Sequence, residues 1–253
     1  MSKPQGRVLC DDLTAACPLL ATDDVRRLRL VLRLGPGSAL ELFDGRGGAR
    51  SARIVDFAGD TVRLVWTGPR VESVRTRVVW MAAAIPKGKR ADFMVEKVCE
   101  LGVTRLTPLV TERGVVRPEA DGSKARRWEA IAEEASRQCR RDDVLEIDPP
   151  QPLEEWIRGL TPGSARFFAH PSDDAVPGRI LSDVARGTSL DLAVGPEGGW
   201  TEAEREHLVR GGFRAVRLGP RILRVETAAI ALAVWAGAGG GDSAEAKCDR
   251  PNP

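Results

Sequence analysis

Two glycine-rich turns in the last third of the chain constrain its fold more than any other feature. Each turn follows a short apolar run that is typical of a strand and leads into a helical segment, and the turns span residues 195–199 (GPEGG) and 218–228 (LGPRILRVETA). Two strand–turn–helix units side by side place bare backbone loops along one edge of a sheet, where open α/β sheets bind ligands. Glycine lets the main chain approach a ligand closely. The sequence therefore predicts a small-molecule site in this part of the chain.

Strands and helices alternate before these turns. The run 78–84 (VVWMAAA) is apolar throughout, which is typical of a strand covered on both faces. Further strands are expected at 105–110, 165–169 and 190–194, and helices at 92–101, 123–139, 153–160 and 179–185. This alternation predicts an α/β fold with a mainly parallel sheet between helices.

The N-terminal part follows a different pattern, because polar and apolar residues alternate in short runs. Strands are expected at 39–43, 52–57 and 61–66, each closed by a turn that contains glycine. Short strands at this spacing predict a small β-barrel or sandwich. One helix is expected at 22–34, with Thr22 or Asp23 as its N-cap.

Length and composition are those of a globular protein with one or two domains. The chain has 253 residues, of which 42% are hydrophobic and 29% are charged. The tail is rich in Gly, Ala, Asp and Ser and lacks an apolar period, which predicts disorder. We expect a β-rich domain, an α/β domain and a disordered tail at 1–72, 73–237 and 238–253, respectively.

Several classes of function are disfavoured by residue usage. The five cysteines are scattered and the chain has two histidines, so neither a metal site nor a disulfide framework is expected. No apolar run is long enough to span a bilayer and the N-terminus lacks a hydrophobic signal core, so we expect a cytoplasmic protein. The net charge of +2 is unremarkable, but arginines gather at 26–33 and 126–141. Arginine suits phosphate binding, and simple solvation is the alternative.

The first glycine turn leaves three alternatives open. Residues 201–204 (TEAE) form a capping box that fixes the start of the following helix. A phosphate could bind there because helix N-termini favour anions. However, the turn lacks the Gly-Lys-Ser/Thr ending of a P-loop, and Glu197 adds negative charge. A cationic or neutral ligand fits better, and a tight turn without a ligand is the third alternative.

The second turn favours a ligand site. Ile222 and Leu223 lie beside Arg224 and Glu226, shortly before an almost wholly apolar helix at 228–235. A helix that is apolar on all sides is buried in its domain or against a second subunit. Charged residues at the start of such a helix are costly unless they are paired or used. Arg224 and Glu226 are therefore either a structural ion pair or part of a site.

An ordered set of motifs closely resembles the RsmE family, the small-subunit ribosomal RNA methyltransferases that act on N3 of a uridine. The match runs from about residue 20 to residue 236, and the set is highly specific although each motif alone is weak. Besides the two glycine turns, the motifs are KGK at 87–89, KVCELGV at 97–103, PL at 108–109, ER at 112–113, RW at 127–128, EA at 134–135, Gln138, Arg141, and the N-terminal matches at 25–34 and 43–45. Two departures stand out. The family often begins with an Arg-aromatic-aromatic strand where this chain has Arg7-Val8-Leu9, and Trp200 stands where Phe is common.

The resemblance implies an activity, a fold and partners. The activity is transfer of a methyl group from S-adenosylmethionine to N3 of uridine-1498 in 16S ribosomal RNA, during ribosome maturation. The implied fold is a SPOUT-class α/β domain with a deep trefoil knot, preceded by a PUA-like β-barrel that binds RNA. The implied partners are 16S ribosomal RNA within the small ribosomal subunit and a second copy of the chain, held through the C-terminal domain.

The resemblance and the chemistry of the reaction together nominate site residues. Uridine N3 is a poor nucleophile until its proton leaves, so the site needs a proton acceptor and positive charge for the developing oxyanion. We expect Arg224 to stabilise the uracil anion and Glu226 to accept or orient the proton. The cofactor is expected at His170, Pro171, Gly195, Pro196, Glu197, Gly198, Gly199, Leu218, Gly219, Ile222, Leu223 and Thr227. RNA is expected at Arg7, Arg26, Arg33, Lys87, Lys89, Arg137, Gln138 and Arg141.

Other functions and roles stay open at this point. The chain could be an RNA-binding module that has lost catalysis, in which case it would bind no S-adenosylmethionine. It could also be a methyltransferase of the same class that acts on another RNA or another nitrogen, since RNA recognition depends on shape and context. A packing role for His170 and surface solvation of Arg137, Gln138 and Arg141 are equal alternatives to their site roles.

Overall fold

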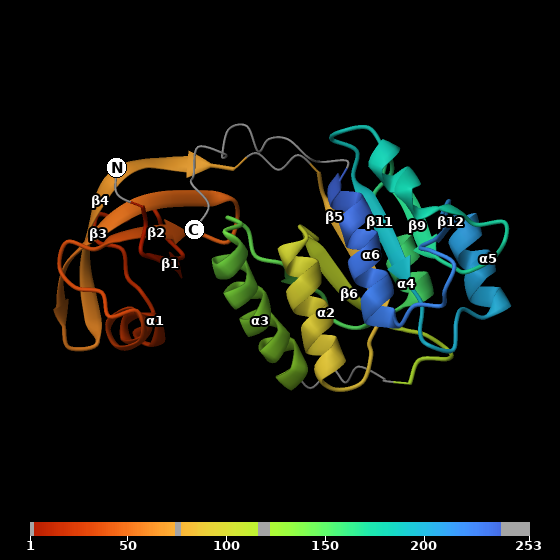
Figure 1. The fold of residues 1–253 in the computed structure, drawn as a ribbon, viewed down its shortest axis with the longest axis horizontal. Coiled ribbons are helices and arrows are strands. Elements are labelled where there is room, and N and C mark those ends of the chain that lie inside the picture. The colour runs from red at the N-terminus through yellow and green to blue at the C-terminus, as the bar shows by residue number, and fades with distance from the viewer. Residues whose placement is uncertain (1–2, 74–76, 116–121, 239–253) are drawn as a thin grey trace. The chain divides into compact units, whose positions relative to one another are not determined.

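The computed structural model of the chain describes residues 3–73, 77–115 and 122–238 (Figure 1). The chain divides into a first unit, residues 1–75 with 136–144, and a second unit, residues 76–135 with 145–253. Segment 136–144, which we expected in the α/β domain, therefore groups with the N-terminal part. The predicted disordered tail lies outside the described residues except for its first residue, Ala238, which ends a helix.

A four-stranded sheet forms the first unit. Its strands are β1 (Gly6–Leu9), β2 (Ala39–Phe43), β3 (Gly48–Ala58) and β4 (Thr61–Glu72), paired in the order β1-β2-β3-β4. β1 pairs parallel to β2, and the other pairings are antiparallel. The predicted strand at 39–43 is confirmed, whereas β3 and β4 are longer than predicted because their pairing continues past two register shifts.

The predicted helix at 22–34 is present in part. The α-helix α1 (Thr22–Arg26) continues as one π-helical turn, η1 (Arg27–Val31). The N-cap prediction is wrong, because the cap residue is Ala21, which has extended backbone and makes no side-chain cap hydrogen bond. Buried side chains of this segment and of the sheet form the core of the unit, including those of Val25, Leu28, Leu40, Leu42 and Ile54.

A parallel sheet forms the second unit, as predicted. The strand order is β10-β12-β9-β11-β5-β6-β7, with β8 also pairing with β6, and every pairing is parallel. The strands are β5 (Val79–Ala84), β6 (Arg105–Val110), β7 (Glu146–Ile147), β8 (Gln151–Pro152), β9 (Ala165–Ala169), β10 (Val176–Pro177), β11 (Leu190–Val194) and β12 (Arg214–Arg217). The strands predicted at 105–110, 165–169 and 190–194 have these bounds in the structure.

Helices cover both faces of this sheet. They are α2 (Lys89–Glu100), α3 (Ser123–Cys139), α4 (Leu153–Arg158), α5 (Glu202–Arg210) and α6 (Val225–Ala238). α6 packs on α2 and across β5 and β11, whereas α4 and α5 share a core with the opposite face (Figure 1). The helix predicted at 179–185 is instead a 3₁₀ helix, η2 (Gly178–Asp183), followed by an i→i+3 hydrogen bond from the Val184 N–H to the Leu181 carbonyl. In the part of the chain that the structure describes, none of the helices combines the length and apolarity needed to cross a membrane.

The strand order brings four loops to one edge of the sheet. β11 lies between β9 and β5, and β12 lies on the other side of β9. Because these strands are parallel, the segments that follow them start at the same edge. Residues 170–171 follow β9, residues 195–199 follow β11, and residues 218–224 follow β12. The loop that leads from β5 into α2 starts beside them.

Candidate functional site

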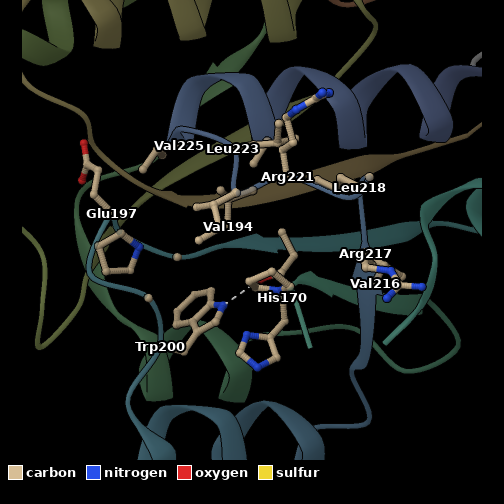
Figure 2. Close-up of a pocket in the computed structure, with 18 residues that line it drawn as sticks. His170, Val194, Glu197, Trp200, Val216, Arg217, Leu218, Arg221, Leu223 and Val225 are labelled. Carbon is tan, nitrogen blue, oxygen red and sulfur yellow. Dashed lines mark hydrogen bonds between the residues drawn. The ribbon is translucent and has the colours of Figure 1, made fainter. Parts of the chain in front are cut away.

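A pocket opens where the loops after β9, β11 and β12 meet the first turn of α6 (Figure 2). In this view His170 and Trp200 lie on one side of the pocket, and Leu223 and Val225 lie on the other. The structure brings together ten of the predicted cofactor residues as pocket lining: His170, Pro171, Gly195, Pro196, Glu197, Gly199, Leu218, Gly219, Ile222 and Leu223. The two glycine turns and the loop after β9 therefore share one cavity.

Two predicted cofactor residues lie outside the pocket lining. The Gly198 carbonyl accepts a hydrogen bond from Arg113 Nη1 (3.2 Å), and a Cβ at Gly198 would lie 3.1 Å from Arg113 Cβ. Gly198 thus packs against the loop after β6. Thr227 is exposed on the first turn of α6, whereas Val225 and Ala228 of the same turn line the pocket.

Sequence reasoning missed eight lining residues. They are Ala169, Val194, Trp200, Val216, Arg217, Arg221, Val225 and Ala228. Most of them immediately precede or follow a predicted loop residue. The predicted ends of the strands could therefore have identified them as pocket-lining residues. Trp200 was noted for its place after the turn but was not assigned to the site.

Trp200 explains why residue 195 is glycine. Its indole Nε1 donates a hydrogen bond to the Ala169 carbonyl (3.1 Å), which fixes the ring between the loops after β9 and β11. A Cβ at Gly195 would lie 2.7 to 3.0 Å from three atoms of this ring. Contacts that short do not occur without a shift of the ring, so the bare backbone at Gly195 lets the indole form part of the pocket wall.

Two other glycines of the pocket have backbone conformations that favour glycine. Gly199 has a φ of +71° and Gly219 a φ of +141°. Side chains rarely adopt such values, and both glycines have open space at the Cβ position. The main chain of each turn is therefore accessible to a ligand.

His170 is held by its backbone and its ring. Its N–H donates to the Val216 carbonyl (3.0 Å), and its ring stacks on Phe168 with centroids 5.9 Å apart. Burial, and to a lesser extent the positive charge of Arg205, lower the pKa of His170 below its ordinary value. The imidazole is therefore neutral at pH 7, as a residue beside a cationic ligand should be.

The predicted capping box is confirmed and does more than cap α5. Thr201 Oγ1 accepts a hydrogen bond from the Glu204 N–H (3.2 Å), and Glu204 Oε2 accepts one from the Thr201 N–H (2.8 Å). The second carboxylate oxygen, Oε1, accepts from the Glu112 N–H (2.9 Å) in the loop after β6. Arg113 of that loop donates to the carbonyls of Gly198 and, at 3.5 Å, Trp200. These contacts fix the C-terminal end of the first glycine turn.

Glu226 pairs with a residue that the sequence did not reveal. Its side chain is 9% exposed, and Oε1 lies 3.8 Å from Arg90 Nη1 on α2. The same Arg90 nitrogen lies 3.8 Å from Oε1 of Glu197 in the first glycine turn. The other oxygen of Glu226, Oε2, is buried and has no hydrogen-bond partner among the described residues.

Arg224 is exposed at the end of the second glycine turn. Its carbonyl accepts the N–H of Ala228, which starts the hydrogen-bond pattern of α6. Among the residues that the structure describes, no ion pair joins Arg224 to Glu226, so the alternative of a structural pair between them is wrong. Neither Arg224 nor Glu226 is among the residues that line the pocket.

Arg7, expected at the RNA, is buried inside the first unit. Its side chain is 8% exposed, and Nε donates to Glu41 Oε1 (2.9 Å). Nη2 pairs with Asp142, and Nη1 donates to the carbonyls of Ser136 (2.9 Å) and Arg141 (2.6 Å). The guanidinium thereby joins β1 to segment 136–144 and has a structural role, because its donors are used within the unit.

The other predicted RNA residues differ in accessibility. In the first unit, Arg137 pairs with Asp24 and Arg141 pairs with Asp143, and their side chains are 14% and 11% exposed. Arg26, Arg33 and Gln138 of that unit are exposed. In the second unit, Lys87 and Lys89 are both exposed and flank Gly88, directly before or at the start of α2. These five residues are the accessible members of the predicted set.

The pocket has the chemistry that S-adenosylmethionine needs. Val194, Leu223, Val225 and Ala228 supply apolar surface for an aromatic ring, and the bare turns offer main-chain donors and acceptors. Glu197 at the rim offers the negative charge that suits a sulfonium or an ammonium group. The residues present therefore fit this cofactor.

Comparison with known proteins defines the class to which this fold and site belong. The family model of the RNA methyltransferase domain matches residues 74–236, and that of the RNA methyltransferase PUA domain matches residues 22–65. The molecule is thus an RNA methyltransferase with a PUA-like N-terminal domain and an α/β domain of the SPOUT type.

The relatives narrow this class to one family. The ribosomal RNA small subunit methyltransferase E of Mycobacterium bovis is 33% identical over 85% of this chain and 84% of the relative, and that of Synechocystis is 31% identical over 88% and 74%. The crystal structure of the Neisseria gonorrhoeae enzyme bound to S-adenosylmethionine has a TM-score of 0.79 and 29% identity, covering 90% of this chain and 94% of that one. A Legionella pneumophila methyltransferase with bound cofactor has a TM-score of 0.78 and 28% identity, covering 93% and 97%. The chain belongs to the ribosomal RNA small subunit methyltransferase E family.

Proposed function

We propose that the chain transfers a methyl group from S-adenosylmethionine to N3 of uridine-1498 in 16S ribosomal RNA, as a step in maturation of the small ribosomal subunit. The observation that carries this proposal is the match to both domain families in one chain, together with a pocket built from the two glycine turns. The activity belongs in the cytoplasm, where the ribosome is assembled. The PUA-like part, residues 1–72, binds RNA, and residues 73–237 carry the transfer.

The pocket-lining members of the predicted set hold the cofactor. The turns contribute main-chain groups, and Gly198 and Thr227 shape the pocket from outside rather than contacting the ligand. When bound, S-adenosylmethionine supplies a methyl group activated by its sulfonium charge. The trefoil knot implied by the resemblance is part of this proposal, since knotted segments of this kind would hold both turns in place.

Two charged residues carry the chemistry on the RNA side. The uridine imide must lose its N3 proton before nitrogen can attack, and Glu226 accepts or orients that proton through the oxygen that has no partner among the described residues. Arg224 is exposed beside the pocket and stabilises the negative charge that develops on the uracil oxygens. General base catalysis of this kind contributes roughly 10²- to 10⁴-fold to a rate.

The proposal is tested by isothermal calorimetry with S-adenosylmethionine and by mass spectrometry of small-subunit RNA after incubation with the purified chain. We expect a heat of binding, one added methyl group and N3-methyluridine in the digest. Glu226→Gln should still bind the cofactor and lose at least about 100-fold in methylation rate. A chain that binds RNA but gives no heat with the cofactor would instead be a non-catalytic module, and a methyl group on another nucleotide would identify another substrate.

We also propose that two copies associate through the C-terminal domain. α6 is almost wholly apolar and leaves Val234 45% exposed, and α2, which packs on α6, leaves Phe93 47% exposed. Exposed apolar surface on packed helices is typical of an interface. Sedimentation equilibrium should give twice the mass of one chain, and Val234→Glu should lower it to the mass of a single chain.

A further inference from the structure

Arg90 occupies an unusual position between two carboxylates. It lies in the first turn of α2 and is not among the residues that line the pocket. Its Nη1 is 3.8 Å from Oε1 of Glu226 and 3.8 Å from Oε1 of Glu197. At that separation the charges attract, but neither contact is short enough to be a hydrogen bond.

The burial of Glu226 makes this arrangement informative. A carboxylate that is 9% exposed is costly unless its charge is compensated and its oxygens are hydrogen-bonded. Among the described residues Glu226 has one cationic neighbour, at a loose distance, and Oε2 has no hydrogen-bond partner. A structural ion pair would be closed more tightly, as the Arg7–Glu41 contact of 2.9 Å in the first unit is. Incomplete satisfaction of a buried group is a property of sites that receive a ligand.

The packing of the second unit explains how the three residues meet. β5 and β11 are neighbours, so the loop that leads from β5 into α2 starts beside the turn that contains Glu197. α6 packs on α2, which brings Glu226 in the first turn of α6 next to Arg90. One guanidinium therefore joins the first glycine turn, which lines the pocket, to the start of the helix that follows the second turn.

We propose that Arg90 is a positioning residue that holds the Glu226 carboxylate in place for proton acceptance, with Glu197 as its second anchor. This inference rests on the proposed role of Glu226. Neither Arg90 nor Glu226 lines the cofactor pocket, and Arg90 Nη1 lies 3.8 Å from Glu226 Oε1, so Arg90 acts through Glu226 and not on the cofactor directly. Its charge attracts the buried Glu226 carboxylate through Oε1 and limits the rotation of that side chain, and Oε2 has no hydrogen-bond partner among the described residues.

The first test separates rate from binding. In the full-length chain, Arg90→Gln should lower kcat for methylation of small-subunit RNA by at least about tenfold, equivalent to about 1.4 kcal/mol, and change the KM for S-adenosylmethionine by less than about threefold. Arg90→Lys keeps the charge and should recover most of the rate. The control is Arg210→Gln, because Arg210 is 67% exposed on α5 and pairs with Glu206. The control should retain the wild-type kcat.

A double-mutant cycle then identifies the partner through which Arg90 acts. In single-turnover measurements, Arg90→Gln should have less than about a twofold effect in the Glu226→Gln background, and in the Glu197→Gln background an effect that is smaller than in the wild type but still larger than in the Glu226→Gln background. Equal losses in the wild-type and Glu226→Gln backgrounds, or an unchanged kcat in Arg90→Gln, overturn the positioning role. Glu226→Gln at the wild-type rate overturns both this inference and the proposed role of Glu226. An inactive Glu226→Gln beside a fully active Arg90→Gln overturns this inference alone.

Discussion

Individual atoms decide the shape of the pocket wall. The Trp200 ring lies against the bare Cα of Gly195, and its Nε1–H reaches the Ala169 carbonyl across the gap between β11 and β9. A methyl group at residue 195 would have to displace the ring or the turn. A smaller aromatic ring at position 200 would also fit this space, which agrees with the phenylalanine that the family commonly has there.

Gly195→Ala tests this contact. The added Cβ would lie 2.7 Å from the indole, so we expect a loss of about 1–3 kcal/mol in the free energy of unfolding and at least about tenfold weaker binding of S-adenosylmethionine. Combining it with Trp200→Phe should recover part of both losses, because the phenyl ring is smaller. Denaturant unfolding and calorimetry measure the two quantities. The control is Gly35→Ala, since a Cβ at Gly35 meets nothing within 4 Å.

His170 gives a prediction about pH. Its pKa is lowered in the folded chain, chiefly by burial, so between that value and the ordinary value of about 6.5 the unfolded chain binds the proton and the folded chain does not. Stability from the neutral imidazole is fully present above about pH 6.5 and is lost as the pH falls, by at most about 1.4 kcal/mol per pH unit. Arg205 opposes protonation, whereas Asp174 and Glu202 favour it more weakly.

The measurement compares wild type with His170→Gln between pH 7.5 and pH 5.5 by urea unfolding. The variant should lose less stability on acidification than the wild type. Parallel curves for the two proteins would contradict the assignment.

At the scale of elements, the start of α5 is a junction rather than a simple helix end. Glu204 satisfies the Thr201 N–H of its own helix cap and the Glu112 N–H of the loop after β6. Since its side chain is the acceptor for both, one carboxylate couples a helix start to a loop that is far away in the sequence. Arg113 of the same loop donates to the carbonyls of Gly198 and Trp200, so the end of the first glycine turn is held by this junction.

Glu204→Ala should therefore cost more than the loss of a helix cap. We expect about 2–3 kcal/mol in the free energy of unfolding, because two backbone N–H groups lose their acceptor together. Glu202→Ala in the same turn of α5 is the matched control, since the Glu202 side chain is 72% exposed, and it should cost less than about 0.5 kcal/mol. Equal effects of the two variants in denaturant unfolding would show that the junction contributes nothing.

The sequence predicted best those strands and helices whose bounds are determined by their own residues. β6, β9 and β11 are mainly apolar runs between turn residues, and α3 carries buried apolar residues at helical spacing, Trp128, Ala132 and Ala135, so their bounds were predictable. The two-residue strands β7, β8 and β10 exist because a neighbouring strand pairs with them, and β12 begins and ends with arginine. Such elements have too weak a pattern of their own to be recognised.

The same distinction holds for the site. Residues of the glycine turns were predictable because local conformation and family motifs both identify them. The pairing of Arg90 with Glu226 depends on α2 packing against α6, and the burial of Arg7 depends on segment 136–144 joining the first unit. Both contacts depend on tertiary packing, which the local sequence pattern does not reveal. An arginine has the same appearance in a sequence whether it is destined for RNA or for a buried ion pair.

For the whole molecule, the question is which of the predicted basic and polar residues contact the RNA. The structure leaves Arg26, Arg33 and Gln138 exposed in the first unit and Lys87 and Lys89 exposed in the second, so we propose that these residues contact the RNA. Arg7 is excluded because its side chain is 8% exposed. Phosphate contacts release counterions, and binding that depends on them weakens as salt rises.

The double variant Lys87→Ala/Lys89→Ala should reduce the slope of log K against log salt concentration, where K is the RNA association constant, by about 1 to 2. A fluorescence-anisotropy titration with small-subunit RNA measures this slope. Arg7→Met should leave that slope unchanged and instead cost about 3–5 kcal/mol of stability, because Glu41 and Asp142 would each lose a cationic partner in a buried site. A flatter slope for Arg7→Met at a temperature where it is folded would place Arg7 at the RNA after all.

Every described residue that lines the pocket lies between Ala169 and Ala228 in the sequence. During translation, β5 and β6 are therefore synthesised well before the residues that line the pocket. A nascent chain stopped at residue 190 would contain the first strands of the sheet but neither of the two glycine turns that form the S-adenosylmethionine pocket. S-adenosylmethionine in the cell can stabilise only a nascent chain that already contains residues up to Ala228, since ligands favour the state that binds them. Ligand protection should accordingly appear late and abruptly along a series of stalled chains, and not grow with their length.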